Sequence, residues 1–470
     1  MNDGVGRDDR QLWPRAVALY QAGRWLEALA CCRELLALAP ATTQLLGLAG
    51  MLAMRLDDAT AAVDFLARAV QQKPDSTELH YNHGNALVRL GRAADGVEAY
   101  RRALALQPDL LPAHNNLGAA LQSLERSDEA ITVFRHAISL AADNPELRRN
   151  LGIALEAAGR RDEAVVAYRH ARMLRPHWPA IHRNLANALL ESGAADEARA
   201  VCEAWLALEP GNLEAIGLMA VALDELGDRA GAARVVDLDR FVRRVEISPP
   251  PGYDSLDAFN HALVEQILAY PSLSVPAVSA PHYNGPAFRT TDELFDRAGG
   301  ALNALKEIVR RESEDYLAAL APAHREHPYF THPPMFWRPT AMATVLDHGG
   351  KLAPHVHYSG YVSGVYYVRI PAFVAASQAD HAGWFEIGRP PARFLRRGRP
   401  DVRLIEPREG TMLLFPSYFF HSTVPFHVAE TRISIAFDAT GAARVAGFAA
   451  VLAWCFRPAV AGRRFALAGS

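Results

Sequence analysis

The first half of this 470-residue chain repeats with a period of 34 residues, and no other feature of the sequence constrains its fold as strongly. Several positions of the period keep one small or rigid residue type from unit to unit, which indicates a repeated structural unit. Proline recurs at Pro40, Pro74, Pro108, Pro176 and Pro210, with Ala142 in the missing place. Alanine recurs at Ala28, Ala62, Ala130, Ala164, Ala198 and Ala232, with Gly96 once. Glycine recurs at Gly23, Gly91, Gly159, Gly193 and Gly227, and in a second register at Gly50, Gly84, Gly118 and Gly152, continued by Ala186 and Ala220.

Each register has a physical role in a pair of helices. A glycine near the middle of the unit ends the first helix, and the proline ends the second because it cannot continue a helix. Small residues in the Gly50 register let the two helices pack closely, and apolar residues recur at helical spacing between these marks. The pattern resembles the tetratricopeptide repeat, which has two antiparallel helices per unit. We therefore predict an all-α tetratricopeptide solenoid of about six and a half units over residues 9–240.

Asparagine follows the same period, in the first helix of four successive units. These residues are Asn82, Asn116, Asn150 and Asn184. In this repeat the first helix lines the concave face, and a carboxamide pairs with both polar groups of a peptide unit. The column resembles the asparagine ladder of O-GlcNAc transferases, which implies a groove that holds an extended peptide or protein segment. Asparagines that bridge adjacent repeats are the alternative. We interpret His80, His114 and His182, two residues earlier, as groove-lining side chains rather than metal ligands.

Composition excludes several classes of protein. Half of the residues are hydrophobic, 21% are charged and the formal net charge is −3, which does not describe a disordered chain. This balance also argues against nucleic acid as a partner, since phosphate binding needs an excess of cations. We predict no membrane span, because no apolar run is long enough, and we do not expect Met1–Gln11 to act as a signal peptide. Four cysteines without zinc-ligand spacing are typical of a reducing compartment, so we expect a cytoplasmic protein.

A second domain of different texture follows the repeats. We predict a linker at residues 241–255, where Pro249–Gly252 breaks any helix. Helical periodicity returns at 256–269 and 292–320, and from about Phe336 runs rich in Val, Ile, Tyr and Phe indicate β-strands. The strand-like runs are 340–347, 359–370, 411–419 and 431–439. We therefore place the second domain at 256–440, with a β core at 330–440 and a helical tail at 441–470.

Three histidines in the β segment form a candidate metal site. His355 and His357 are two residues apart, so on a strand their side chains project to the same side. His421 ends another strand-like run, and Arg432 and Ser434 follow on the next, again two residues apart. Imidazole nitrogen is the commonest metal ligand in proteins. The set predicts a metal site with a cationic side chain nearby.

The order of these residues resembles the iron(II)- and 2-oxoglutarate-dependent oxygenases. That resemblance covers about residues 330–440 and implies a double-stranded β-helix, a jelly-roll of the cupin-like kind, with flanking helices. It implies that His355 and His421 bind Fe(II) and that Arg432 binds the remote carboxylate of 2-oxoglutarate, a role that suits a planar guanidinium. Ser434 would donate a further hydrogen bond, and Tyr366 or Tyr367 would touch the cosubstrate, with Tyr367 our candidate. Dioxygen is the second cosubstrate that the resemblance implies.

One position departs from that family pattern. Two residues after the first histidine the family usually has a carboxylate, and here the residue is His357. Three interpretations are open. His357 replaces the carboxylate in a three-histidine site, or the metal is held by His355 and His421 with water. In the third, the metal is lost or a carboxylate such as Asp380 comes from elsewhere.

Two functions remain in play at this point. In the first, the repeats present a peptide or protein to an oxygenase that hydroxylates it. In the second, the β domain is a cupin-like scaffold or sensor that binds a metal or small ligand without turnover. The spacing from Gly349 to His357 and from Gly410 to His421 fits the cupin motifs, but the cupin glutamate is absent at Tyr361 and Val362. Arg432 also has no role in a cupin, so we favour the oxygenase.

Overall fold

The structure is a computed structural model of the whole chain, and it divides into two compact units between Ile181 and His182. The helical tail predicted at 441–470 lies outside the described residues, apart from its first residue. The described residues are 9–38, 41–273, 283–284, 287–290, 294–296, 299–320, 327–330, 333, 337–346, 351–372, 374, 380–394, 397–426 and 430–441.

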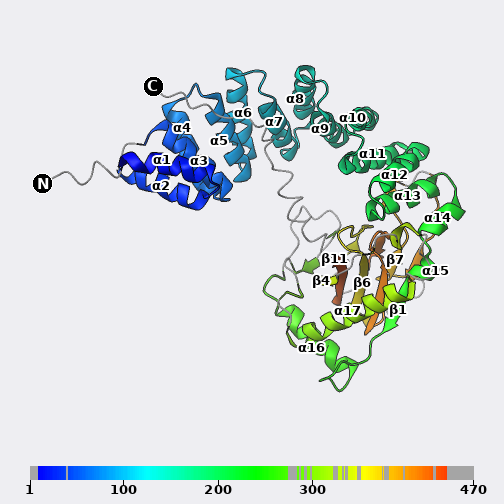
Figure 1. Cartoon of the computed structure of the whole chain (residues 1–470). Helices are drawn as coiled ribbons and strands as arrows, with labels where there is room; N and C mark the ends of the chain where they lie inside the picture. Colours follow the sequence, from blue (N-terminus) through cyan, green and yellow to red (C-terminus); the bar gives the residue numbers. More distant parts are fainter. Residues whose placement is uncertain are drawn as a thin grey trace. The chain divides into compact units, whose positions relative to one another are not determined.

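Helices fill the repeat region, and they alternate as the first and second helices of successive units (Figure 1). The first helices begin every 34 residues, from Asp9 to Leu213. The described residues contain seven pairs of a first and a second helix. The predicted all-α solenoid is therefore confirmed, with a seventh unit whose second helix is short. Among the described residues, no helix is both long and apolar enough to cross a bilayer. The first helices are α1 (Asp9–Gln21), α3 (Thr43–Arg55), α5 (Thr77–Arg89), α7 (Leu111–Ser123), α9 (Pro145–Ala157), α11 (Pro179–Ser192) and α13 (Leu213–Glu225). The second helices are α2 (Trp25–Leu38), α4 (Ala59–Gln72), α6 (Ala93–Leu106), α8 (Ser127–Leu140), α10 (Arg161–Leu174), α12 (Ala195–Leu208) and α14 (Arg229–Val235).

The turn between the two helices of a unit requires a left-handed residue. Every glycine of the Gly23 register has a positive φ, between 74° and 83°. Two units lack the glycine, and Asp57 and Glu125 stand there with φ of 65° and 59°. The turn geometry is therefore kept even where a side chain makes that backbone conformation costly.

The second glycine register is matched in size by a residue sixteen positions later. A Cβ added to Gly118 would lie 2.4 Å from the ring of Phe134, and one added to Gly152 would lie 2.3 Å from Tyr168. Where the register has Ala186 instead, the matching position holds Cys202, which is fully buried. Glycine on the first helix thus leaves room for an aromatic ring on the second, and the unit with alanine has a smaller side chain in the matching position.

Two of the three repeat histidines, His80 and His114, contact the loop that precedes their helix. Nε2 of His80 lies 2.9 Å from the carbonyl oxygen of Pro74, and Nε2 of His114 lies 2.8 Å from that of Pro108. In the next unit, Nε of Arg148 donates to the carbonyl of Ala142 at 3.0 Å. His80, His114 and Arg148 thus each bond a backbone carbonyl of the loop that joins two successive units.

The second unit is built on antiparallel β-sheets, as a jelly-roll-like domain should be. Its largest sheet has six strands in the order β1-β9-β6-β11-β4-β3, and smaller sheets are β10-β7-β8 and β2-β5. The large-sheet strands are β1 (Arg243–Glu246), β3 (Ala287–Arg289), β4 (Trp337–Leu346), β6 (Val362–Arg369), β9 (Thr411–Pro416) and β11 (Arg432–Gly441). The others are β2 (Tyr283–Asn284), β5 (Lys351–Leu352), β7 (Phe385–Ile387), β8 (Arg403–Ile405) and β10 (His421–Thr423). Short helices are α15 (Leu238–Phe241), η2 (Pro328–Phe330) and η3 (Ala392–Phe394).

Two helices, α16 (Leu256–Leu268) and α17 (Gly300–Leu320), pack on one face of the six-stranded sheet (Figure 1). On that face, the hydroxyl of Tyr366 donates to Oδ1 of Asn260 in α16 at 2.6 Å. Successive strand residues point to opposite faces. Tyr367 therefore belongs to the other face, where it pairs across strands with Ser434.

The last repeat belongs to the core of the second unit. Leu213, Ile216 and Phe241 lie in one buried apolar cluster with residues of the large sheet. The segment predicted as a linker, 241–255, is not one, because it contains β1, which pairs with β9 at the sheet edge. The chain passes from solenoid to sheet without an intervening tether.

Candidate metal centre

The three predicted histidines come together beside the six-stranded sheet. His355 and His357 follow β5, and His421 begins β10. The two segments pair antiparallel, with the amide of each of His355 and His421 donating to the carbonyl of the other at 3.0 Å. One ring nitrogen from each histidine lies within 4.8 Å of the others. Two short extended segments thus bring three imidazoles to one point.

An oxygen contacts Nδ1 of every one of these rings. Nδ1 of His355 lies 2.8 Å from the carbonyl of Ala353, and Nδ1 of His421 lies 3.0 Å from that of Phe419. A carbonyl only accepts, so Nδ1 of these two rings carries the proton and Nε2 presents the lone pair. Metal-bound histidines usually have this arrangement, in which the second nitrogen fixes the tautomer.

His357 differs because a carboxylate holds its Nδ1. The two oxygens of Asp438 lie 3.0 and 3.1 Å from this nitrogen. Burial lowers the pKa of His357, but the Asp438 carboxylate raises it by more, and the net pKa is above the usual value. The cluster itself contains no carboxylate, but the carboxylate of Asp438 contacts one of its three histidines, His357, at Nδ1.

Aromatic side chains enclose His421. Its ring centroid lies 4.9 Å from that of Phe415 on β9 and 5.7 Å from that of Phe385 on β7. The imidazole thus sits between the large sheet and a small one, and it is 7% exposed. Such walls exclude water from one side of the cluster and hold the ring in place.

Arg432 is buried on the face of the sheet that carries Tyr367, and it is 2% exposed. Its guanidinium carbon lies 5.5 Å from the ring centroid of Tyr367. Among the described residues, neither Nε nor Nη1 of Arg432 has a hydrogen-bond partner, and the hydroxyl of Tyr367 has none. Burial lowers the pKa of Arg432 and raises that of Tyr367 to about 12. A buried cation with unpaired donors is costly, so an anion in this place would stabilise it.

The remaining predicted site residues are Ser434, on the same strand as Arg432, and Asp380. Arg432, Ser434 and Asp438 share one face of β11, and Ser434 is 7% exposed. Asp380 is exposed and accepts a hydrogen bond from the amide of Ala382 at 3.2 Å. It is not a member of the histidine cluster. The geometry therefore supports the three-histidine interpretation over one that recruits Asp380.

Asp438 is the residue that sequence reasoning missed. The signal was present, because Asp438 continues the alternation of Arg432 and Ser434 along the same strand. What could not be read is its contact with His357, which lies 81 positions earlier in the chain.

The asparagine column has contacts within the repeats. Nδ2 of Asn116 donates to Oδ1 of Asn85 at 2.8 Å and to the hydroxyl of Tyr81 at 3.3 Å. Nδ2 of Asn150 donates to Oδ1 of Asn115 at 2.8 Å. These bonds join adjacent units, as the bridging alternative expects. The other two members of the column, Asn82 and Asn184, are half-buried on α5 and α11.

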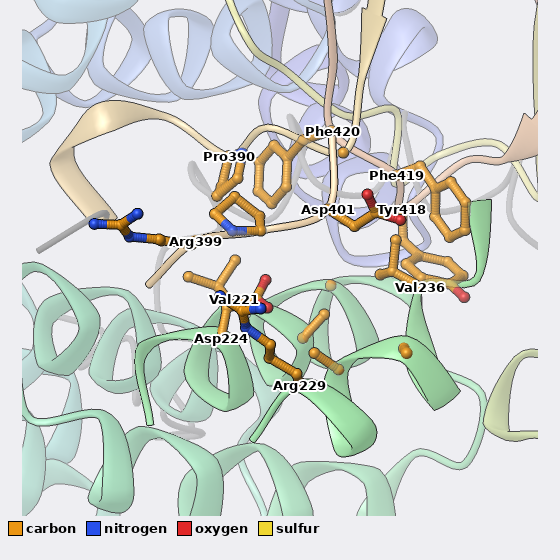
Figure 2. A pocket seen from close by; sticks show the side chains of 16 residues that line it. Val221, Asp224, Arg229, Val236, Pro390, Arg399, Asp401, Tyr418, Phe419 and Phe420 are labelled. Carbon is orange, nitrogen blue, oxygen red and sulfur yellow. The ribbon is translucent and has the colours of Figure 1, made fainter. Parts of the chain in front are cut away.

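A cavity of about 400 Å³ lies on the other side of the segment that leads to His421. Figure 2 shows Phe420 and Pro390 on one side of it and Val221 and Asp224 of α13 on the other. Burial and the nearby acids Glu225 and Asp401 raise the pKa of Asp224 to about 6. Because neighbouring strand residues alternate, Phe420 faces this cavity and His421 faces the histidine cluster.

Comparison with protein families separates the repeats from the β-rich segment. The family model described as "Putative 2OG-Fe(II) oxygenase" matches residues 341–438. Two tetratricopeptide repeat models match residues 14–77 and 81–145, and 121–188, 155–207 and 189–239. No curated protein matches the chain.

Two of the similar solved structures are titled as tetratricopeptide repeat proteins. MamA from Desulfovibrio magneticus RS-1 is 20% identical, with a TM-score of 0.34, over 36% of this chain and 94% of that one. A tetratricopeptide repeat protein from Parabacteroides merdae is 16% identical, with a TM-score of 0.41, over 49% and 91%. YrrB, titled a TPR protein with an unusual peptide-binding site, is 21% identical, with a TM-score of 0.34, over 37% and 91%. The matched family models show that this chain joins tetratricopeptide repeats to a domain that matches the family described as "Putative 2OG-Fe(II) oxygenase".

Proposed function

We propose that this protein is an Fe(II)- and 2-oxoglutarate-dependent dioxygenase that hydroxylates a peptide or protein held by its repeats. The observation that carries the proposal is the pairing of a three-histidine cluster with a buried arginine on the same domain. A metal-binding scaffold would need the histidines alone. The two unpaired donors of Arg432 support an anion at this place.

The donor set fits the metal. Imidazole nitrogen suits iron(II), and a site with three protein ligands leaves positions open for a chelating cosubstrate and for dioxygen. Bound iron would supply the activation of dioxygen, coupled to oxidative decarboxylation of 2-oxoglutarate to succinate and carbon dioxide. His355, His357 and His421 would hold it through Nε2, while the oxygens at their Nδ1 atoms keep the rings in orientation.

Arg432 would bind the remote carboxylate of 2-oxoglutarate. Its planar guanidinium offers two parallel donors, which match the two oxygens of a carboxylate. Ser434, two residues along the same face, would donate a further hydrogen bond, and the Tyr367 ring supports the guanidinium from below. The hydroxyl of Tyr367, beside the guanidinium, would donate to the same anion. These residues select a dicarboxylate of one length and orient it.

The repeats would supply the substrate. Tetratricopeptide repeats commonly bind protein segments in a concave groove. The asparagine column provides carboxamides that pair with a peptide backbone, and its bonds between units would hold those carboxamides in register. Asn82, Asn116, Asn150 and Asn184 are the residues that we propose for this contact.

The test of the reaction is succinate formation. Purified full-length protein with Fe(II), ascorbate, 2-oxoglutarate and dioxygen should form succinate, at least slowly without substrate. His421→Ala should abolish this, and Arg408→Lys, on the surface beside Glu406, should leave it unchanged. The proposal fails if wild type forms no succinate and Arg432→Ala binds 2-oxoglutarate as tightly as wild type.

The test of the substrate class is a comparison of proteomes. Mass spectrometry of cells with wild-type protein and with His421→Ala should reveal peptides that gain one oxygen atom only with wild type. Binding of such a peptide should weaken by about 10-fold when Asn116 and Asn150 are both replaced by alanine, because two buried hydrogen bonds are lost. Unchanged affinity would show that the asparagines only bridge the repeats.

A further inference from the structure

The hydrogen bond between Asp438 and His357 has a consequence for the charge of the metal site. A site of two histidines and one carboxylate places one negative charge on the metal, whereas three neutral imidazoles place none. Here the carboxylate lies one hydrogen bond further out, at 3.0 Å from Nδ1 of His357. It makes the imidazole a stronger donor through its other nitrogen.

Asp438 is held firmly in this position. The hydroxyl of Ser363, on the neighbouring strand β6, donates to its Oδ1. Ser363 and Asp438 are directly opposite in the strand register. On the other side, Gly360 leaves room for the carboxylate, because an added Cβ would lie 2.8 Å from Oδ1. The neighbours of Asp438 thus hold its carboxylate in contact with His357.

The loop that carries His357 is fixed from the backbone as well. The amide of His357 donates to the carbonyl of Ser417 at 3.1 Å, and the amide of Gly360 donates to the carbonyl of His357 at 3.0 Å. These bonds set the position of the residue but not the rotation of its ring. The ring orientation and the site of its proton depend on Asp438.

We propose that Asp438 is a positioning residue that replaces the missing ligand carboxylate from outside the cluster. It orients His357 so that Nε2 faces the metal, fixes the proton at Nδ1, and contributes the negative charge through the imidazole. This inference rests on the metal site of the proposed function. It adds that His357 is a competent ligand only with Asp438 behind it.

The experiment measures the affinity for Co(II) by competition with a chromophoric chelator. It uses the full-length protein as wild type, Asp438→Asn, His357→Ala and the double variant His357→Ala/Asp438→Asn. We expect Asp438→Asn to bind Co(II) about 10- to 100-fold more weakly than wild type, as loss of an outer partner of a ligand does. In the His357→Ala background the same substitution should change the affinity by less than about 2-fold, since its target is gone.

Two results would overturn the inference. Equal affinity of Asp438→Asn and wild type would show that the carboxylate does nothing for the metal. An equal loss in both backgrounds would show that Asp438 acts on the fold and not through His357. Failure of wild type to bind Co(II) at all would instead overturn the metal site, and with it the proposed function.

Two further variants control for a general effect of charge and for misfolding of Asp438→Asn. Asp315→Asn removes the same charge from an exposed position of α17 and should leave Co(II) affinity unchanged. Ser363→Ala keeps Asp438 and removes its clamp, and should weaken Co(II) binding by less than Asp438→Asn does. If Asp438→Asn does not fold, Ser363→Ala decides the question by itself, with and without His357→Ala.

Discussion

The guanidinium of Arg432 lies over the ring of Tyr367, and both side chains are buried on one face of the six-stranded sheet. The contact leaves two guanidinium nitrogens of Arg432 and the hydroxyl of Tyr367 without partners among the described residues. A cation–π contact compensates part of the desolvation of a buried arginine. The remainder is available to an anionic ligand.

Substitution of this arginine should separate cosubstrate binding from metal binding. We expect Arg432→Lys to weaken 2-oxoglutarate binding by about 10- to 100-fold, because an ammonium cannot form two parallel hydrogen bonds to a carboxylate. Tyr367→Phe keeps the ring under the guanidinium and should have a smaller effect. Isothermal titration of the Co(II)-loaded protein with 2-oxoglutarate measures both. Loss of Co(II) affinity in Arg432→Lys would mean that the residue supports the cluster and not the cosubstrate.

A single methyl group added at Gly118 should lower the stability of the repeats. Gly118→Ala would bring a Cβ to 2.4 Å from the Phe134 ring. We expect a loss of about 1–3 kcal/mol in the free energy of unfolding, the usual cost of overpacking. Without the clash, glycine to alanine in a helix would instead stabilise by roughly 0.5–1 kcal/mol. The sign measured by urea unfolding therefore decides the matter.

A compensating substitution provides the control for that clash. Phe134→Leu should cost stability by itself but should remove most of the penalty of Gly118→Ala. The double variant should therefore show a favourable coupling of about 0.5–3 kcal/mol. Strict additivity would contradict the pairing of these two positions.

The turn at Glu125 offers a route to a more stable protein. Glu125 has φ of 59°, in a register that is otherwise mostly glycine. Glu125→Gly should stabilise the repeats by about 0.5–1 kcal/mol, because the left-handed strain exceeds the entropy that glycine gains in the unfolded chain. Asp57→Gly should gain less, since Arg89 donates to Asp57 Oδ1 at 2.9 Å. Thermal unfolding followed by circular dichroism measures both variants, and a lower midpoint for Glu125→Gly would contradict the prediction.

Glu214 should make stability depend on pH. Burial raises its pKa to about 7, although the charge of Arg183 opposes the shift. At a pH between about 4.5, the pKa of Glu214 in the unfolded chain, and about 7, its pKa in the folded protein, the folded protein keeps a proton on Glu214 that the unfolded chain has released. Stability from this group is therefore complete below about pH 4.5 and is lost as the pH rises through about 7.

The matching variant is Glu214→Gln, which cannot ionise. It should equal wild type at low pH and exceed it at pH 8 by a few kcal/mol at most, since one pKa unit equals about 1.4 kcal/mol. Urea unfolding across this range measures the difference. Glu203→Gln, exposed on α12, is the control and should leave the pH profile unchanged. Parallel profiles of Glu214→Gln and wild type would exclude the ionisation of Glu214 as the cause.

The repeats could be predicted from sequence because each turn and each helix contact imposes one residue type at one spacing. Gly91 and Gly118 are examples, and the structure gives them a left-handed turn and a tight helix contact. The role of His114 could not be predicted in this way. A recurrent polar residue has the same period whether it lines a groove or bonds the loop of its own unit.

The histidines of the site could be predicted because His355 and His357 are two residues apart in a β-rich part of the sequence, although in the structure both follow β5 and lie outside the named strands. β1 was missed because its sequence, Arg-Arg-Val-Glu, is mostly exposed and lacks the apolar alternation of an inner strand. Only its pairing with β9 identifies it as part of the sheet. Contacts between residues far apart in sequence, such as that of His357 with Asp438, leave no local pattern.

The sharing of a core between the last repeat and the sheet has a consequence for how such a protein can evolve. Tyr418, three residues before His421, donates its hydroxyl to the carbonyl of Val235 at 2.6 Å. A deletion that removed α13 and α14 would open the β-rich domain and remove this bond. The buried cluster that contains the sheet has no described member before Leu206. Repeats that precede this residue could be gained, lost or exchanged while every member of that cluster stays in the chain, so the number of repeats and the sheet core can change separately.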